Sequence, residues 1–189
     1  MKYEENSYYH VYNRGAHRQN LFLEDRNYVY CVELMGKYLP RYDVEIQAYC
    51  LLPNHYHLVM SQREGGSISR FLQATFNSYA QSFNSLYNHT GTIFESRPKG
   101  KLIDSELYAV QVVRYIHLNP VAAGLVKSPV DWVFSDYNVW CGLQSPVISD
   151  LTLRESYFGS AYQYRRFVAE VEGPDGVSEL RSLLIEDAE

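Results

Sequence analysis

The sequence predicts an α+β domain built around an antiparallel sheet of the split βαβ type. Two observations carry this prediction. Apolar residues alternate in some stretches, as in strands, and recur every three or four positions in others, as in helices. These stretches follow one another as strand, helix, strand, strand, helix, strand, helix. The chain has 189 residues, of which 46% are hydrophobic and 21% charged, so it can bury a core without disulfides.

The first half of the chain contains the clearest strand pair. A strand is predicted over residues 8–12, because its aromatic and β-branched residues end at the turn Asn13-Arg14-Gly15. A helix follows from Asp25, the expected cap, to about Leu39. Residues 44–52 and 55–60 are then two strands joined by the turn Pro53-Asn54, which makes them a hairpin.

The second half begins with the most regular helical pattern, which covers four turns over residues 68–83. A strand over 92–103, interrupted at Pro98, comes next. The following helix is expected to begin at Asp104 and to stop at Asn119-Pro120. A helical turn over 121–126 and a late helix over about 155–170 complete the expected elements.

The first six elements give the ferredoxin-like arrangement, in which two helices cover one face of the sheet. The seventh can cover the open face. We expect a main domain over residues 1–140, a C-terminal helical extension over 141–172 and an acidic tail over 173–189. The net charge is −5. Because residues 170–189 hold seven acidic side chains and one arginine, the rest of the chain is close to neutral, at +1.

Composition excludes several classes of protein. The three cysteines have no ligand-like spacing, so neither a disulfide framework nor a cysteine-based zinc site is expected, and the cytoplasm is the default location. No apolar run is long enough for a membrane span, and no signal peptide is recognisable. The 18 tyrosines suit base stacking, although tyrosine also packs cores.

The segment His55-Tyr56-His57 places two imidazoles on one face of a strand, about 7 Å apart, where both can bind one metal ion. Both histidines are expected to be partly exposed. Two polar residues on a solvated face would give the same pattern, so the pair alone is weak evidence.

The helix after Asp104 supplies the second candidate group. Ala109, Val113 and Ile116 form its core stripe, while Tyr115 and Asn119 lie side by side on a neighbouring stripe. Facing the sheet, they would add a nucleophile and a third ligand to the two histidines. Simple packing explains a helical tyrosine equally well. His117 lies between the stripes, is given no role and is expected to be solvated.

Together, Leu52-Pro53-Asn54-His55-Tyr56-His57-Leu58-Val59 and the later Tyr115-Ile116-His117-Leu118-Asn119-Pro120-Val121 resemble the single-tyrosine HUH transposases, and in detail the REP-associated tyrosine transposases. Tyr9-His10-Val11 resembles the opening strand of that family, and residues 132–137 its aromatic stretch. The resemblance covers about residues 8–140.

The resemblance implies that the chain cuts and rejoins single-stranded DNA, commonly beside a hairpin. It makes Tyr115 the nucleophile, which forms a 5′-phosphotyrosine, and makes His55, His57 and Asn119 the metal ligands. For two imidazoles and an amide, Mg²⁺ or Mn²⁺ is expected. Related enzymes act as monomers or as homodimers that exchange the tyrosine helix.

For DNA contact the sequence offers a basic segment and one arginine in the first turn. The predicted DNA-binding residues are Arg14, Phe94, Arg97, Lys99 and Lys101. A solvated basic loop explains the segment equally well. Pro98 and Ala122 depart from the family pattern, which has an aromatic and a basic residue there.

Two other functions remain open from sequence. A non-catalytic domain that binds single-stranded nucleic acid would need neither metal nor Tyr115. A metal hydrolase with water as nucleophile would keep its activity without Tyr115. A domesticated transposase and an active mobile element would share all of these residues.

Overall fold

In a computed structural model, which describes residues 2–171, a four-stranded antiparallel sheet has the strand order β2-β3-β1-β4. The strands are β1 (Tyr8–Arg14), β2 (Val44–Leu52), β3 (His55–Gln62) and β4 (Lys99–Ile103). The order and the antiparallel pairing are those of the ferredoxin-like fold, so the predicted fold class is confirmed.

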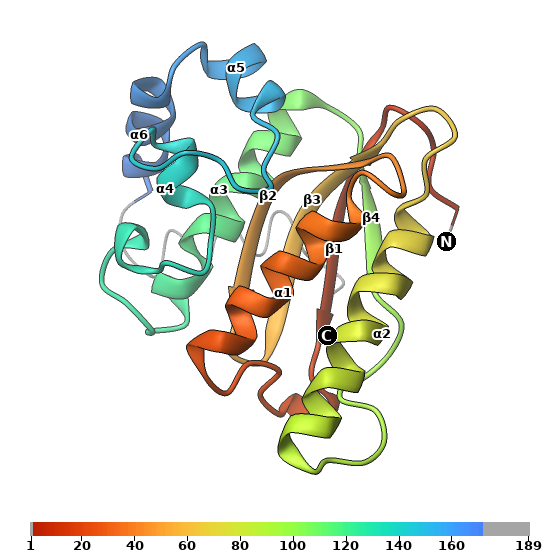
Figure 1. The fold of residues 1–189 in the computed structure, drawn as a ribbon. Helices are drawn as coiled ribbons and strands as arrows, with labels where there is room; N and C mark the ends of the chain where they lie inside the picture. Colours follow the sequence, from red (N-terminus) through yellow and green to blue (C-terminus); the bar gives the residue numbers. More distant parts are fainter. Residues whose placement is uncertain (1, 172–189) are drawn as a thin grey trace.

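Helices cover both faces of this sheet (Figure 1). The helices are α1 (Asp25–Tyr38), α2 (Ile68–Tyr87), α3 (Glu106–Ala122), α4 (Tyr137–Trp140), α5 (Thr152–Phe158) and α6 (Ala161–Ala169), with short 3-10 turns η1 (Ala16–Arg18) and η2 (Pro129–Asp131). Helices α1 and α2 lie on one face, and α3 lies on the other, against β2 and β3. Helix α3, the seventh predicted element, covers the face that the first six leave open, as expected. Helices α4, α5 and α6 gather beside β2.

The alternation of side chains along the strands produces two separate cores. Tyr56, Leu58 and Met60 of β3 belong to the core under α1 and α2, whereas Val59 belongs to the core under α3. His55 and His57 have the same parity as Val59, so they face α3. The sheet thus divides an aliphatic and aromatic core from the face that carries the histidines.

Several helix boundaries differ from the prediction. Helix α1 is capped by Glu24, which forms a capping box with Asn27, in place of the expected Asp25. Helix α3 begins one residue later than expected because Ser105, not Asp104, accepts the hydrogen bond from the backbone N–H of Tyr108. The predicted stop at Asn119-Pro120 is wrong.

Helix α3 continues to Ala122 with Pro120 inside its last turn. The proline removes one N–H donor, but the Ala123 N–H still donates to Asn119 at 2.8 Å, so the turn closes around it. Residues 109–120 are buried apart from the partly exposed Gln111. Tertiary packing therefore outweighs the local stop at Pro120, and only the first two residues of the expected turn over 121–126 are helical.

Two other predicted elements are divided. Of the strand expected over 92–103, only the part from Lys99 onward forms β4. Before Pro98 the segment makes a single isolated bridge, between Phe94 and Gly15. The late helix is split into α5 and α6 at Gly159, whose positive φ of 65° ends α5, and at Ser160, which caps α6. The predicted tail over 173–189 lies outside the described residues.

All three cysteines are buried and free. Within residues 2–171, no helix is long and apolar enough to cross a membrane.

Candidate active site

The strands bring two histidines and two further aromatic side chains to one place. In the β1–β3 register Tyr12 lies opposite His57, and Arg14 lies opposite His55. His10 lies on the same face of β1 as Tyr12. Its ring stacks on the His57 ring, with centroids 5.1 Å apart. The rings of His55 and His57 meet edge to face at 5.1 Å. The imidazoles therefore form one cluster on the α3 side of the sheet.

Helix α3 adds the predicted tyrosine and asparagine to this cluster. The Asn119 amide nitrogen Nδ2 lies 3.3 Å from Nε2 of His57. The Tyr115 ring meets the His57 ring edge to face, with centroids 5.8 Å apart. The structure thus places His55, His57, Tyr115 and Asn119, which come from two elements far apart in the sequence, around one point.

Burial of the two strand histidines is unequal. His55 is partly exposed, as expected, but the expectation for His57 is wrong, because only 5% of it is exposed. Tyr115 and Asn119 are also buried, at 5% and 7%. The cover over His57 comes from α3, which sequence patterns placed only loosely.

The inner nitrogen of each strand histidine has a partner in the protein. Nδ1 of His55 lies 2.6 Å from the side-chain oxygen of Asn54, which can only accept, so His55 donates from Nδ1. Its Nε2 then carries the lone pair. Nδ1 of His57 lies 3.0 Å from Nε2 of His10. A neutral imidazole binds a metal through its unprotonated nitrogen, and the geometry at His55 supplies that tautomer.

The donor set suits a hard or borderline divalent ion. Among residues 2–171, no group of three or more His, Cys, Asp or Glu side chains is placed to hold a metal. A metal site here would combine the Asn119 amide with the two imidazoles. A half-turn of that amide exchanges its nitrogen and oxygen, which presents an oxygen toward His57. Three neutral ligands leave positions for water and phosphate oxygens.

His10 was not a candidate from sequence, where Tyr9-His10-Val11 served only to mark the opening strand. It is 2% exposed. Burial, with the nearby Lys101 charge as a smaller cause, lowers the pKa of His10 to about 3. The ring is therefore neutral at physiological pH. Strand alternation places His10 and Tyr12 on one face, but only the register between β1 and β3 brings His10 to His57.

The predicted DNA-binding residues divide into two groups. Lys99 and Lys101 lie opposite Tyr12 and His10 in the β1–β4 register, so they share the histidine face, and both are exposed. Nζ of Lys101 lies 5.7 Å from the centre of the Tyr108 ring. A basic edge of β4 therefore borders the candidate site.

Of the remaining three, only Arg14 borders the histidines, because it lies opposite His55 in the β1–β3 register. Arg14 pairs with Glu95, and Arg97 is exposed in the loop before β4. Phe94 packs against Tyr56 and Phe76, with ring centroids 6.3 and 5.5 Å away. Both partners belong to the core under α1 and α2, so Phe94 lies away from the histidines.

His117 is fully buried, so the expectation of a solvated ring is wrong. Its Nδ1 lies 2.6 Å from the Tyr164 hydroxyl and its Nε2 lies 2.8 Å from a carboxylate oxygen of Asp136. The same carboxylate accepts hydrogen bonds from the backbone N–H of Tyr49 and the hydroxyl of Ser149. This buried network ties α3 to β2 and to the C-terminal helices.

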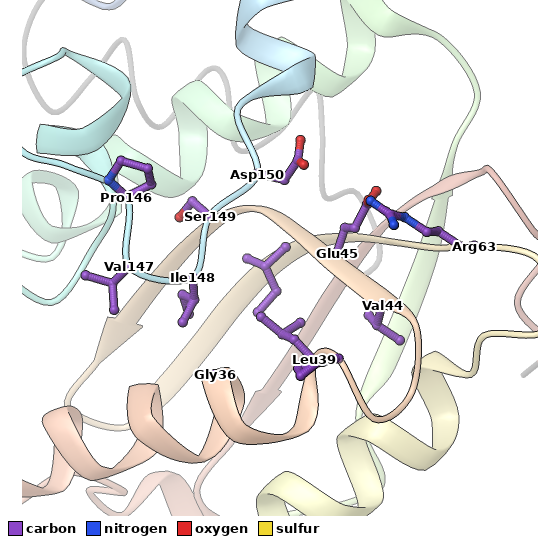
Figure 2. A pocket seen from close by; sticks show the side chains of 12 residues that line it. Gly36, Leu39, Val44, Glu45, Arg63, Pro146, Val147, Ile148, Ser149 and Asp150 are labelled. Atoms are coloured by element: carbon purple, nitrogen blue, oxygen red, sulfur yellow. The ribbon is translucent and has the colours of Figure 1, made fainter.

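A shallow hollow lies at the other end of the hairpin from His55 (Figure 2). It is lined by the end of α1, the start of β2 and residues 146–150, with an ion pair between Glu45 and Arg63 on its rim. Asp150, also in its lining, receives a hydrogen bond from Gln47 at 3.4 Å. Its three charged side chains thus all have partners, and no candidate catalytic residue lines it.

Comparisons with known proteins point to one family. Residues 3–119 match the family model of the IS200-like transposases. A solved structure of a REP-associated tyrosine transposase bound to a REP hairpin is similar in fold, with a TM-score of 0.65 and 22% identity over 81% of this chain and 93% of that one. A crystal structure of a candidate transposase from Deinococcus radiodurans R1 has a TM-score of 0.43 and 18% identity, over 61% and 95% of the two chains. The comparison with curated proteins found no match.

Proposed function

Because the chain belongs to the IS200-like transposase family, we propose that it cuts and rejoins single-stranded DNA beside a hairpin, with Tyr115 as the nucleophile. The observation that carries the proposal is the meeting of Tyr115 and Asn119 with His57 at one point. The structure similar in fold holds a REP hairpin, which supports DNA of this type as the substrate class.

In the proposed reaction the Tyr115 hydroxyl oxygen attacks the scissile phosphorus and loses its proton to solvent. The P–O bond to the departing 3′ oxygen breaks, and that oxygen leaves as a hydroxyl. The DNA 5′ end stays on the protein as a phosphotyrosine. Because the ester bond is conserved in the adduct, the 3′-hydroxyl of a second strand can reverse the step without ATP.

His55, His57 and Asn119 are the residues that would hold Mg²⁺ or Mn²⁺. Such an ion would polarise the scissile phosphate and offset the charge that develops on it. An unassisted phenol has a pKa near 10, so Tyr115 needs a substrate made electrophilic in this way to react at neutral pH. The edge-to-face contact with His57 holds the Tyr115 ring beside the proposed ligands.

We propose that the DNA strand follows the edge of β4, where Lys99 and Lys101 would contact phosphates. Arg97 lies in the loop before this edge, and Arg14 lies at the end of β1, opposite His55. Phe94 packs in the opposite core and is left out of this path. The acting form is a monomer or a homodimer.

The test is incubation with hairpin-bearing single-stranded oligonucleotides and Mn²⁺, followed by a denaturing gel. We expect a covalent protein–DNA band that disappears in Tyr115→Phe and persists in Tyr108→Phe, the matched tyrosine on the same helical stripe. Binding without any adduct would indicate a non-catalytic single-strand-binding domain. Cleavage that survives Tyr115→Phe would indicate a hydrolase that uses water.

A further inference from the structure

His10 lies behind His57, on the side away from Asn119. It lies in β1, one of the two inner strands, and is 2% exposed. Its ring packs against those of Tyr12 and His57, with each centroid 5.1 Å from its own. Its Nε2 lies 3.0 Å from Nδ1 of His57. This is a direct hydrogen bond between two buried imidazoles, in which one ring donates its N–H to the unprotonated nitrogen of the other.

We propose that His10 is the positioning residue that fixes the tautomer of His57, by accepting the Nδ1–H of His57 at its own Nε2. The lone pair of His57 then lies on Nε2, the nitrogen that faces Asn119. This inference rests on the proposed function in one respect, namely that His57 uses Nε2 as a metal ligand. His10 itself touches neither the DNA nor the ion in this scheme.

The hydrogen bond can be donated by either ring, and the choice has different consequences for the site. If His10 donated, Nδ1 of His57 would accept and Nε2 of His57 would carry the hydrogen. A protonated Nε2 has no lone pair and cannot bind a metal ion. If His57 donates, its Nε2 is ready to bind before any ion arrives. Only the second arrangement makes the ring a ligand.

The contact at the neighbouring histidine fits the second arrangement. Asn54 accepts from Nδ1 of His55 at 2.6 Å, so the lone pair of His55 lies on Nε2. With His10 as acceptor, both members of the pair have the same tautomer, each held by a partner on its Nδ1 side. Metal-binding histidines usually donate this second N–H to a carboxylate, a carbonyl or water. Here an amide serves one ring and an imidazole serves the other.

Burial explains why an imidazole can act in this position. His10 sits opposite Val59 and one step diagonally from His57 in the β1–β3 register. A carboxylate at the same buried site would bring a charge into the protein interior, and its desolvation costs free energy. A neutral imidazole offers an acceptor of the right reach without that cost.

The test uses two substitutions at His10 and two readouts. His10→Phe removes the acceptor and keeps an aromatic ring, whereas His10→Gln keeps an acceptor oxygen. His89→Gln is the control, because His89 contacts Asn84 and lies far from the site. Long-range ¹H–¹⁵N NMR of the metal-free full chain reports which nitrogen of His57 is protonated. Titration with Mn²⁺, followed by electron paramagnetic resonance, reports affinity without any need for cleavage.

In the wild type we expect the His57 proton on Nδ1. His10→Phe should shift His57 toward the Nε2–H tautomer and weaken Mn²⁺ binding by about 10- to 100-fold, while His10→Gln restores most of both. The tautomer of His55 should not change in either variant, and thermal unfolding identifies any variant that has not folded.

A wild-type His57 protonated on Nε2, or a folded His10→Phe variant with unchanged tautomer and Mn²⁺ affinity, would overturn the role of His10. Failure of the proposed function gives a different pattern. If the wild type binds no Mn²⁺ but His57 still carries its proton on Nδ1 in a His10-dependent way, the metal site is wrong and the positioning contact stands.

Discussion

Two polar clusters on the α3 side of the sheet, one around His117 and one around His55 and His57, differ in the groups that the imidazole nitrogens contact. Both nitrogens of His117 contact fully buried groups, the Asp136 carboxylate and the Tyr164 hydroxyl. The Nδ1 atoms of His55 and His57 instead contact the polar side chains of Asn54 and His10. The Nε2 side of His57 meets Asn119, which is itself able to bind an ion.

The difference shows how the same side chain serves structure in one place and chemistry in another. A histidine with both nitrogens saturated by buried groups has none left for a ligand, so it holds elements together. A histidine such as His57, whose Nε2 faces an amide and whose ring meets a phenol, can be a ligand. We therefore expect substitutions in the first cluster to lower stability and substitutions in the second to lower activity.

The largest effect is expected from His55→Ala. It removes one proposed metal ligand, so cleavage of hairpin-bearing single-stranded DNA should fall below detection. Because His55 is only partly buried, the free energy of unfolding should fall by no more than about 1 kcal/mol. Gel assays of cleavage and urea denaturation measure the two quantities. Full cleavage by this variant in the presence of a chelator would contradict the metal site.

The opposite pattern is expected for Asp136→Ala. The substitution leaves His117, Ser149 and the backbone N–H of Tyr49 without their buried acceptor. Breaking such a network should lower the free energy of unfolding by about 3 kcal/mol or more. Urea denaturation followed by circular dichroism checks this. A loss below about 1 kcal/mol would mean that the network does not secure α3.

A smaller effect is expected for Lys101→Ala, on the β4 edge. Removing one phosphate contact should weaken single-strand binding at low salt and reduce the slope of log affinity against log salt by about 0.7. Lys37→Ala is the control, because Lys37 is exposed on α1, on the other side of the sheet. Fluorescence anisotropy at several salt concentrations measures both. Equal slopes for the two variants would move the DNA path away from β4.

The smallest effect is expected from deleting residues 173–189. This segment carries a net charge of −4, from five acidic residues and one arginine. Its removal should strengthen DNA binding slightly, because the repulsion between the tail and the phosphates is lost. Where salt already screens that repulsion, binding should stay unchanged. Anisotropy titrations of the full and shortened chains decide this. Weaker binding after the deletion would show that the tail takes part in DNA binding.

The order of elements could be predicted from sequence because apolar periodicity is a local property of the chain. The hairpin around Pro53-Asn54 and the long helix α2 match their patterns closely. Local stop signals failed where packing opposes them, as at Pro120, which lies inside the buried α3. Caps also failed by one residue at Asp25 and Asp104, where neighbouring side chains are better placed to accept the backbone hydrogen bond.

The candidate site could be predicted only in part. His55 and His57 share a strand face, and Tyr115 and Asn119 share a helical stripe, so each pair was visible as a local pattern. His10 was not, since its contact with His57 depends on the register between β1 and β3. His117 was misassigned for a similar reason. Its partners Asp136 and Tyr164 lie 19 and 47 residues further on, and no local pattern joins them.

The central claim is that Tyr115, held beside His57, is the nucleophile of a DNA strand transferase. Mass spectrometry of the trapped protein–DNA complex tests it most directly, after nuclease and protease digestion. We predict a nucleotide attached through a 5′ phosphate to Tyr115. A nucleotide on Tyr108 or on any other residue would contradict the assignment.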